Sequence, residues 1–306
     1  MTSAGGPPIR PFTAEHVAAA AQLACLLEVS APKPGNVAPT HPPTPPTSPS
    51  LGDTKNFHDT RYEDFLASAA AIGPAFLRAG RRPLGATIRD ACAATACWTR
   101  ANTNLGIVLL LAPLARAALD SRGGTLRARV ARVLLRATVR DASDVYVAIR
   151  LAHPAGLGHA EEQDLAHTPT NKLRTVMALA ADRDSVAREY ATDYAITFEL
   201  GAPTLRRARL DLLSWNDAIV ETYLTVLAFA PDTHIARKLG TGVAAEVSRR
   251  ARAILVAGGV RTPAGRRRVA ALDRALRDAR NARNPGTTAD LTAAAIFVVL
   301  LEGGWS

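Results

Sequence analysis

The stretch that decides how this chain is organised reads EVSAPKPGN and runs from Glu28 to Asn36. It follows a segment rich in Ala and Leu, the composition of a helix. Two prolines then remove amide donors and restrict φ, so we expect the helix to end here. The glycine at position 35 allows a turn or a close approach to a ligand. A carboxylate at a helix end therefore lies one short loop from a lysine and an asparagine.

These side chains together suit a substrate that carries phosphate. Lys33 supplies a mobile positive charge, Gly35 an open backbone N–H, and Asn36 both a donor and an acceptor. Glu28 could then serve as a base or a metal ligand. The alternative is a helix C-terminus followed by a proline-rich surface loop, and the stretch taken alone favours that simpler interpretation.

Composition favours helices over strands. Of the 306 residues, 48% are hydrophobic but only 5% are aromatic, so the apolar content is mostly Ala, Leu and Val. Strands usually draw on aromatic and β-branched residues. The formal net charge is +10, most of it from Arg, which favours anionic partners such as nucleotides and coenzymes. A genome that prefers Arg codons would produce the same bias.

The cysteines and the apolar runs predict a cytoplasmic protein outside the membrane. Cys25, Cys92 and Cys97 are odd in number and fall inside predicted helices, which is typical of reduced thiols. No apolar signal core is present at the N-terminus. The longest apolar runs, 105–115 and 291–301, are too short to span a bilayer.

Hydrophobic periodicity predicts an all-α, single-domain multi-helix bundle over residues 13–306. Residues 1–12 are expected to be flexible, and residues 38–50, with six prolines, to form a disordered Pro-rich insertion. We expect Thr13 to cap the first helix, Gly73-Pro74 to interrupt the second, and 232–240 to be a short polar element. The predicted helices are 14–29, 62–72, 85–100, 105–119, 125–139, 142–152, 170–181, 184–199, 205–229, 242–257, 264–282 and one from the 284–290 segment to about 302.

Polar segments at 33–36, 102–106 and 284–290 each come before a very apolar helix, the first of them indirectly. The first turn of a helix offers free N–H groups and the positive end of its dipole. Asn102, Thr103 and Asn104, or Thr287 and Thr288, could therefore present side chains to a phosphate beside those groups. Helix capping is the favoured explanation for any one of these segments, so the functional interpretation depends on their recurrence.

Five motifs in this order resemble those of the triphosphoribosyl-dephospho-CoA synthase family over residues 14–302. They are Glu28-Val-x-x-Pro-Lys-Pro-Gly35, Asp59 with Phe65 and Ser68, Asn102-Thr103-x-x-Gly106, Asp232-x-x-x-x-Arg237-x-x-Gly240, and Asn284-Pro-Gly-x-x-Ala-Asp290-Leu. Residues 156–158 and 177–190 are more similar to the branch found in methanogens and methylotrophs. Such proteins accompany the synthesis of methanopterin-type one-carbon carriers there.

The resemblance implies a transferase. The 2′-hydroxyl of 3′-dephospho-CoA would attack C1′ of the ATP ribose, adenine would leave, and Mg²⁺ with Lys or Arg would hold the triphosphate. The implied catalytic residues are Glu28, Asp59 and Asp290, and the candidate Mg²⁺ ligands are these three and Asp232. Lys33 and Arg237 would bind phosphate. The pocket would be completed by Asn36, Asn102, Thr103, Asn284 and the backbone of Gly35, Gly106 and Gly286.

One departure concerns the acceptor. The family's central segment reads Asn-Thr-His-Lys-Gly, whereas this chain has Asn104-Leu105 in place of His-Lys. Ribosyl transfer from ATP to another acceptor, in tetrahydromethanopterin-type cofactor synthesis, is therefore an alternative. A non-catalytic nucleotide- or RNA-binding protein is another, but the arginine-rich segments have no interleaved aromatic residues to stack on bases, so no nucleic acid is expected. A homodimer is left open.

Overall fold

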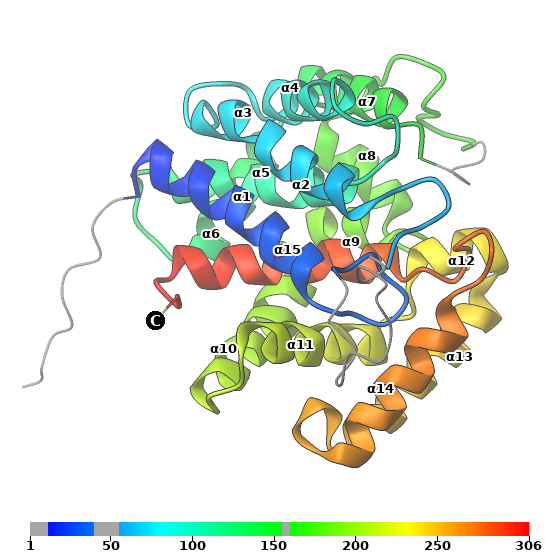
Figure 1. The fold of residues 1–306 in the computed structure, drawn as a ribbon. Helices are drawn as coiled ribbons and strands as arrows, with labels where there is room; N and C mark the ends of the chain where they lie inside the picture. Colours follow the sequence, from blue (N-terminus) through cyan, green and yellow to red (C-terminus); the bar gives the residue numbers. More distant parts are fainter. Residues whose placement is uncertain (1–11, 40–54, 155–159, 306) are drawn as a thin grey trace, which may run out of the picture.

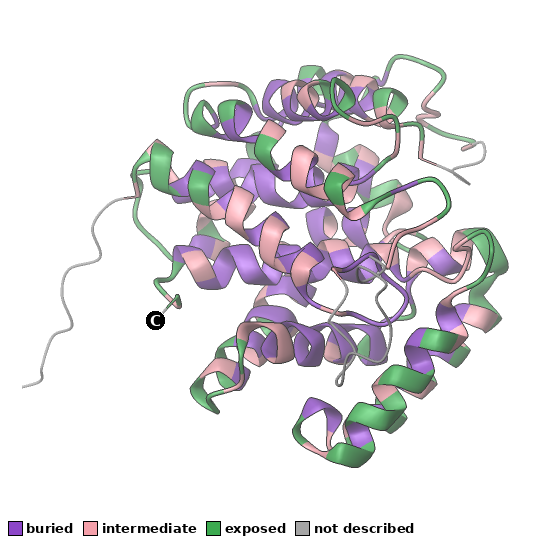
Figure 2. Ribbon diagram, in the orientation of Figure 1, coloured by how far each residue is buried: buried purple, intermediate pink, exposed green. Residues whose placement is uncertain are grey.

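Two apolar helices, α5 (Leu105–Ala118) and α15 (Gly286–Leu301), form the centre of the fold. The computed structural model describes residues 12–39, 55–154 and 160–305. α1 (Ala14–Ser30) packs along α15, and α5 packs against both of them (Figure 1). Figure 2 shows the centre of the molecule almost entirely buried, whereas α13 and α14 expose much of their surface. The long apolar runs are therefore core helices.

The other helices surround this centre. In Figure 1, α3, α4 and α7 lie above it, α10 and α11 below it, and α12, α13 and α14 descend at the right. Their bounds are α2 Tyr62–Ala71, α3 Gly73–Leu77, α4 Leu84–Ala96, α6 Leu126–Arg136, α7 Val139–Ala152, α8 Leu173–Ala180, α9 Ser185–Ala191, the π-helix η1 Ile196–Gly201, α10 Ala202–Leu210, α11 Trp215–Phe229, α12 Thr233–Leu239, α13 Thr241–Val256, the 3₁₀-helix η2 Gly259–Arg261 and α14 Pro263–Leu276.

The all-α prediction is confirmed. Within the described ranges there is no strand, and the isolated antiparallel bridge between Ala38 and Lys55 is the nearest approach to one. The predicted flexible N-terminus, up to residue 11, and the Pro-rich insertion from residue 40 onward lie outside the described residues. No helix in the described part of the chain has the length and apolarity needed to cross a lipid bilayer.

Several predicted helix boundaries are wrong, among them the end of the predicted helix 85–100, since α4 ends at Ala96. The span 184–199 is divided into α9 and η1, with positive φ at Asp193 (52°) and Tyr194 (62°). The span 205–229 is divided into α10 and α11, with φ of 61° at Leu212. α6 ends before Thr138, which forms a capping box with Asp141 at the start of α7, and α14 ends at 276 rather than near 282.

Pro113 inside α5 explains the division between α9 and η1. Proline has no N–H, so the carbonyl of Leu109 loses its normal partner within the helix. The Tyr190 hydroxyl donates to that carbonyl at 2.7 Å, and the Tyr194 hydroxyl donates to the carbonyl of Leu110 at 2.8 Å. Both rings are fully buried. The irregular backbone near Tyr194 therefore places two hydroxyls against a proline-interrupted helix.

Candidate active site

A cavity of about 630 Å³ opens where the C-terminal end of α1 meets the N-terminal ends of α5 and α15. Helices α7, α8 and α12 supply the rest of its wall. Ten of the residues predicted from sequence line it, namely Glu28, Asn36, Asp59, Asn102, Thr103, Gly106, Arg237, Asn284, Gly286 and Asp290. Lys33, Gly35 and Asp232 are outside this lining. Segments that are distant in sequence thus share one cavity.

Asp290, in the first turns of α15, lies against the start of α5. Its carboxylate has no hydrogen-bond or ion-pair partner among the residues the structure describes. A Cβ added at Gly106 would lie 2.0 Å from Oδ2 of Asp290, so only glycine permits this approach. Burial raises the pKa of Asp290 well above its usual range, and repulsion from Glu28 raises it further. The site therefore holds a carboxyl group with an elevated pKa.

Glu28, at the end of α1, is paired with Lys33. Lys33 Nζ lies 2.9 Å from Oε1 of Glu28. It also donates to the carbonyl of Glu28 and, at 3.2 Å, to that of Ala31. The lysine thus satisfies carbonyls at the C-terminus of α1 while it compensates the buried carboxylate. Lys33 Nζ is therefore bonded to the end of α1, and Lys33 is not part of the cavity lining.

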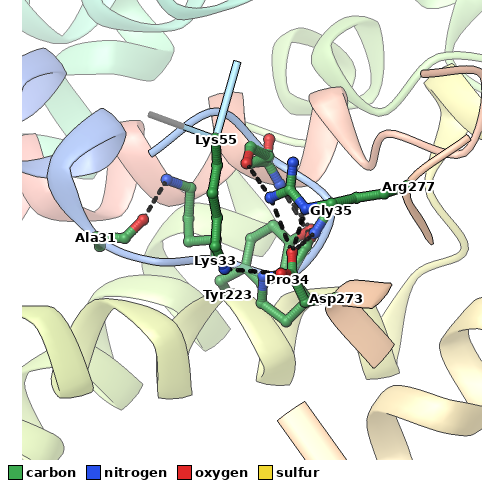
Figure 3. A network of polar contacts seen from close by, with 9 residues as sticks. Ala31, Lys33, Pro34, Gly35, Lys55, Tyr223, Asp273 and Arg277 are labelled. Carbon is green, nitrogen blue, oxygen red and sulfur yellow. Dashed lines mark hydrogen bonds and ion pairs between the residues drawn. The ribbon is translucent and has the colours of Figure 1, made fainter. Parts of the chain in front are cut away.

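The loop that follows is attached to α14 through Gly35 (Figure 3). The Gly35 N–H donates to Oδ1 of Asp273 at 2.8 Å, and its φ is +75°. Asp273 also accepts from Lys55 at 2.7 Å and from Arg277 at 2.9 Å. Burial alone would raise the pKa of Asp273, but these bonds from Arg277 and Lys55 hold it below its usual value. The backbone donor expected for phosphate is therefore occupied by a carboxylate.

Asn36 and Tyr223 fix the other end of the loop. The Tyr223 hydroxyl donates to the carbonyl of Pro34 at 2.8 Å and accepts from Nδ2 of Asn36 at 2.9 Å. Arg277 donates to the Asn36 carbonyl at 2.7 Å. Tyr223, on α11, is fully buried. Asn36 therefore lines the cavity with its amide oriented by the core.

Asp232 connects two helices. It accepts from the Ile235 N–H at 3.0 Å as the N-cap of α12, and from the N–H and hydroxyl of Thr288 in α15 at 2.7 Å each. Burial raises its pKa, although these hydrogen bonds act in the opposite direction. This carboxylate holds α12 against α15 and is buried away from the cavity.

The polar segment before α5 is organised by its own side chains. Oδ1 of Asn102 accepts from the Leu105 N–H at 3.2 Å, and Thr103 and Ser68 share a hydrogen bond of 2.6 Å. Asn104 donates to the Thr95 hydroxyl at 3.1 Å. At the positions of the family's His and Lys, this chain has two buried residues, one bonded to its own α4 and the other apolar.

Asp59 lies at the rim. Its side chain is 62% exposed, and its Oδ2 is 3.6 Å from Nε2 of His58. Asn284 and Gly286 line the wall at the start of α15. Asp59 is therefore accessible to an ion or ligand from solvent.

Sequence reasoning missed most of the positive charge. Arg237 is paired with Asp184 at 2.6 Å. Other cationic residues line the cavity and form no salt bridge within the described ranges: Arg100, Arg183, Lys238 and Arg280. Lys238 directly follows Arg237 of the Asp232–Gly240 motif, and this position could have predicted it as a residue of the site. The other three lie in ordinary loop positions that carry no local signal.

His234 was also missed, although it lies between Asp232 and Arg237. It lines the cavity next to Gly286. Burial, with Lys238 and Arg237 nearby, lowers its pKa to about 3. His234 is therefore neutral at physiological pH and can accept or donate a hydrogen bond without carrying charge.

A match to the CitG family, described as ATP:dephospho-CoA triphosphoribosyl transferase, extends over residues 14–306. This chain belongs to that family. A solved structure from Archaeoglobus fulgidus, named for triphosphoribosyl-dephospho-CoA synthase, is 31% identical to this CitG family member. It superposes with a TM-score of 0.61, covering 78% of this chain and 99% of that one. The family suggested by the sequence motifs is confirmed.

Two curated relatives of this family member come from Pseudomonas. A protein of Pseudomonas paraeruginosa, named "Probable 2-(5''-triphosphoribosyl)-3'-dephosphocoenzyme-A synthase", is 32% identical over 201 residues, which are 65% of this chain and 59% of that protein. A Pseudomonas aeruginosa protein of the same name is 38% identical over 109 residues, 35% of this chain and 36% of that protein. The matched region thus spans about three fifths or less of these relatives.

Taken together, the site combines carboxylates with unpaired cations in one cavity. Among the described residues no group of three or more His, Cys, Asp or Glu side chains could hold a metal ion. The cations of this cavity can bind a polyanion. The carboxylate of Asp290 can accept a proton from the hydroxyl group of a bound ligand.

Proposed function

We propose that this chain transfers the triphosphoribosyl group of ATP to the 2′-hydroxyl of 3′-dephospho-CoA in the cytoplasm. A bond forms between that hydroxyl oxygen and C1′ of the ATP ribose, and the C1′–N9 bond to adenine breaks. The hydroxyl proton passes to a carboxylate, and adenine leaves with a proton. The product is 2′-(5″-triphosphoribosyl)-3′-dephospho-CoA. Family membership supports this reaction.

The observation that carries the proposal is the Asp290 carboxylate, which lines the cavity together with Glu28 and has no hydrogen-bond or ion-pair partner in the described part of the chain. A general base works best when its pKa lies near the operating pH, so a raised pKa suits Asp290 as the acceptor of the hydroxyl proton. Glu28 is paired with Lys33 and would stabilise positive charge that develops at C1′. Lys33 would act through Glu28 rather than by touching phosphate.

We assign the triphosphate to the unpaired cations, above all Arg183, Lys238 and Arg280, with Arg237 oriented by Asp184. Protein sites for Mg²⁺ commonly combine one or two carboxylates with substrate phosphates and water. The exposed carboxylate of Asp59 fits that role, whereas the oxygens of Asp232 are already bonded. The ion would neutralise charge on the phosphates when bound.

The wall residues would position the nucleotide. Asn102, Thr103 and Gly106 stand at the start of α5, and Asn284 and Gly286 stand at the start of α15. Helix N-termini favour negative groups through free N–H donors and the helix dipole. His234, which is neutral, would offer a hydrogen bond to the departing adenine.

The test is adenine release, followed by chromatography after incubation with ATP, Mg²⁺ and dephospho-CoA. We expect release with the wild type and its loss in Asp290→Asn and Glu28→Gln. Asp217→Asn is a matched control, because that half-buried acid is paired with Arg266 away from the cavity. Wild-type rates in both site variants would remove these carboxylates from the chemistry.

A second acceptor has one observation in its favour, since Asn104 and Leu105 replace the family's His-Lys and line the cavity without offering it a cation. The same assay with other hydroxyl acceptors, including pterin-type one-carbon carriers, tests this alternative. If adenine is released only with such an acceptor, ATP remains the proposed donor and dephospho-CoA is replaced as the acceptor.

A further inference from the structure

The cavity has two chemically different ends. One end holds the acids and cations described above. The other end extends between α7 and α8, with polar residues of the segment 160–165 along its outer edge. Six apolar side chains of the two helices line it, and together we name them the apolar arm: Val145, Ile149, Leu173, Val176, Met177 and Ala180.

The apolar arm is made from one face of each of two helices. Val145 and Ile149 are one turn apart on α7, and Leu173, Val176, Met177 and Ala180 have the spacing i, i+3, i+4, i+7 on α8. Leu173 and Val145 are 0% and 1% exposed, whereas Ile149 and Val176 are half-buried. The half-buried side chains leave apolar surface that a ligand can cover.

The outer wall of the arm is held in place by hydrogen bonds. The Tyr146 hydroxyl of α7 donates to the carbonyl of Gln163, and Arg150 donates to the carbonyl of Leu165 at 2.7 Å. Gln163 in turn bonds Thr170 through both ends of its amide, at 2.9 Å each. The segment 160–170 is therefore fastened to α7 beside the arm.

A triphosphate would lose hydration in this arm without gaining a cation, so the arm does not suit the charged part of ATP. Dephospho-CoA consists of an ADP unit joined to an uncharged pantetheine chain. Resting on the proposed function, we propose that the apolar arm holds the pantetheine chain of the acceptor. The acceptor's ribose then lies toward Glu28 and Asp290, where the two ends of the cavity join.

The experiment compares dephospho-CoA with ADP, which has the same ribose hydroxyl but no pantetheine. In the wild type we expect kcat/KM for adenine release to be about tenfold or more higher with dephospho-CoA, the size expected for burying one to two aliphatic groups. Val176→Asp should remove most of that advantage and leave the value for ADP within about twofold. Thr175→Asp, an exposed neighbour on α8 outside the cavity lining, is the matched control.

A second variant keeps the test decisive if Val176→Asp fails to fold. Val176→Ala removes apolar surface without adding charge, and it should weaken dephospho-CoA selectively if Val176→Asp fails to fold. Equal losses with both acceptors, or a wild type that uses ADP as well as dephospho-CoA, would overturn the pantetheine assignment.

Calorimetry separates this proposal from the proposed function. If no acceptor gives adenine, the proposed reaction is wrong. Dephospho-CoA should still bind the wild type about tenfold more tightly than ADP does. The two ligands should bind Val176→Asp with equal affinity. Equal binding of the two ligands to the wild type would overturn the subsite by itself.

Discussion

Lys33 Nζ lies 2.9 Å from Oε1 of Glu28, and 0% of the lysine side chain and 5% of the glutamate side chain are exposed. A lysine that local sequence presents as a phosphate ligand is thus the counter-ion of a buried carboxylate. The pair couples the end of α1 to the cavity wall. Several consequences of this site and its supporting core can be measured.

Replacing Lys33 alone should lower the free energy of unfolding more than replacing both Lys33 and Glu28. Lys33→Met leaves the Glu28 carboxylate buried without compensation, which typically costs about 3–5 kcal/mol. The double variant Glu28→Gln/Lys33→Met should recover much of this loss, as urea denaturation will show. Lys172→Met, at an exposed position, is the control. Strictly additive effects of the two single substitutions would contradict the coupling.

Asp290→Asn should lower the rate of adenine release and raise the free energy of unfolding at pH 8. The folded-state pKa of Asp290 lies above its ordinary value, so the native state binds the proton more tightly than the unfolded chain. Wild-type stability therefore falls as pH rises from about 4 through the raised pKa. The variant should be more stable than the wild type at pH 8, with a smaller difference at pH 5. Its adenine release should fall by about 100-fold or more. A stability difference that is independent of pH would refute the assignment.

Gly106→Ala should separate α5 from α15 or displace the carboxylate, because the new Cβ would lie 2.0 Å from Oδ2 of Asp290. We expect a loss of about 1–3 kcal/mol in the free energy of unfolding together with loss of adenine release. Gly123→Ala is the matched control, since no atom lies within 4 Å of its added Cβ. An active, fully stable Gly106→Ala variant would show that this contact is dispensable.

Tyr190→Phe should leave the carbonyl of Leu109 buried and without a donor, at a cost of about 1–3 kcal/mol. In a Pro113→Ala background the new N–H at position 113 can serve that carbonyl. Tyr190→Phe should therefore cost less there than in the wild-type chain. Denaturation of the four proteins measures the difference, and an equal cost in both backgrounds would disprove the proline-based explanation.

Helix identity was largely predictable because its signals are local. Thr13 accepts from the His16 N–H at 3.2 Å as the predicted cap of α1, and α2 ends just before Gly73-Pro74. The division of 184–199 was not predictable, because the Tyr190 hydroxyl there bonds a carbonyl orphaned by a proline about 80 residues earlier. Local propensity has no information about such a partner.

The sequence by itself determined the all-α class, the order of the helices and, through motifs, the family. These depend on composition, periodicity and short patterns that act within a few residues of themselves. Tertiary structure alone decided which polar groups remain available. Asp273 takes the Gly35 N–H, Lys33 binds Glu28, and Arg183 and Arg280 reach the cavity with no salt bridge to any residue that the structure describes. The physical reason is that a side chain's chemistry is local, whereas its nearest partner is set by packing between segments far apart in the chain.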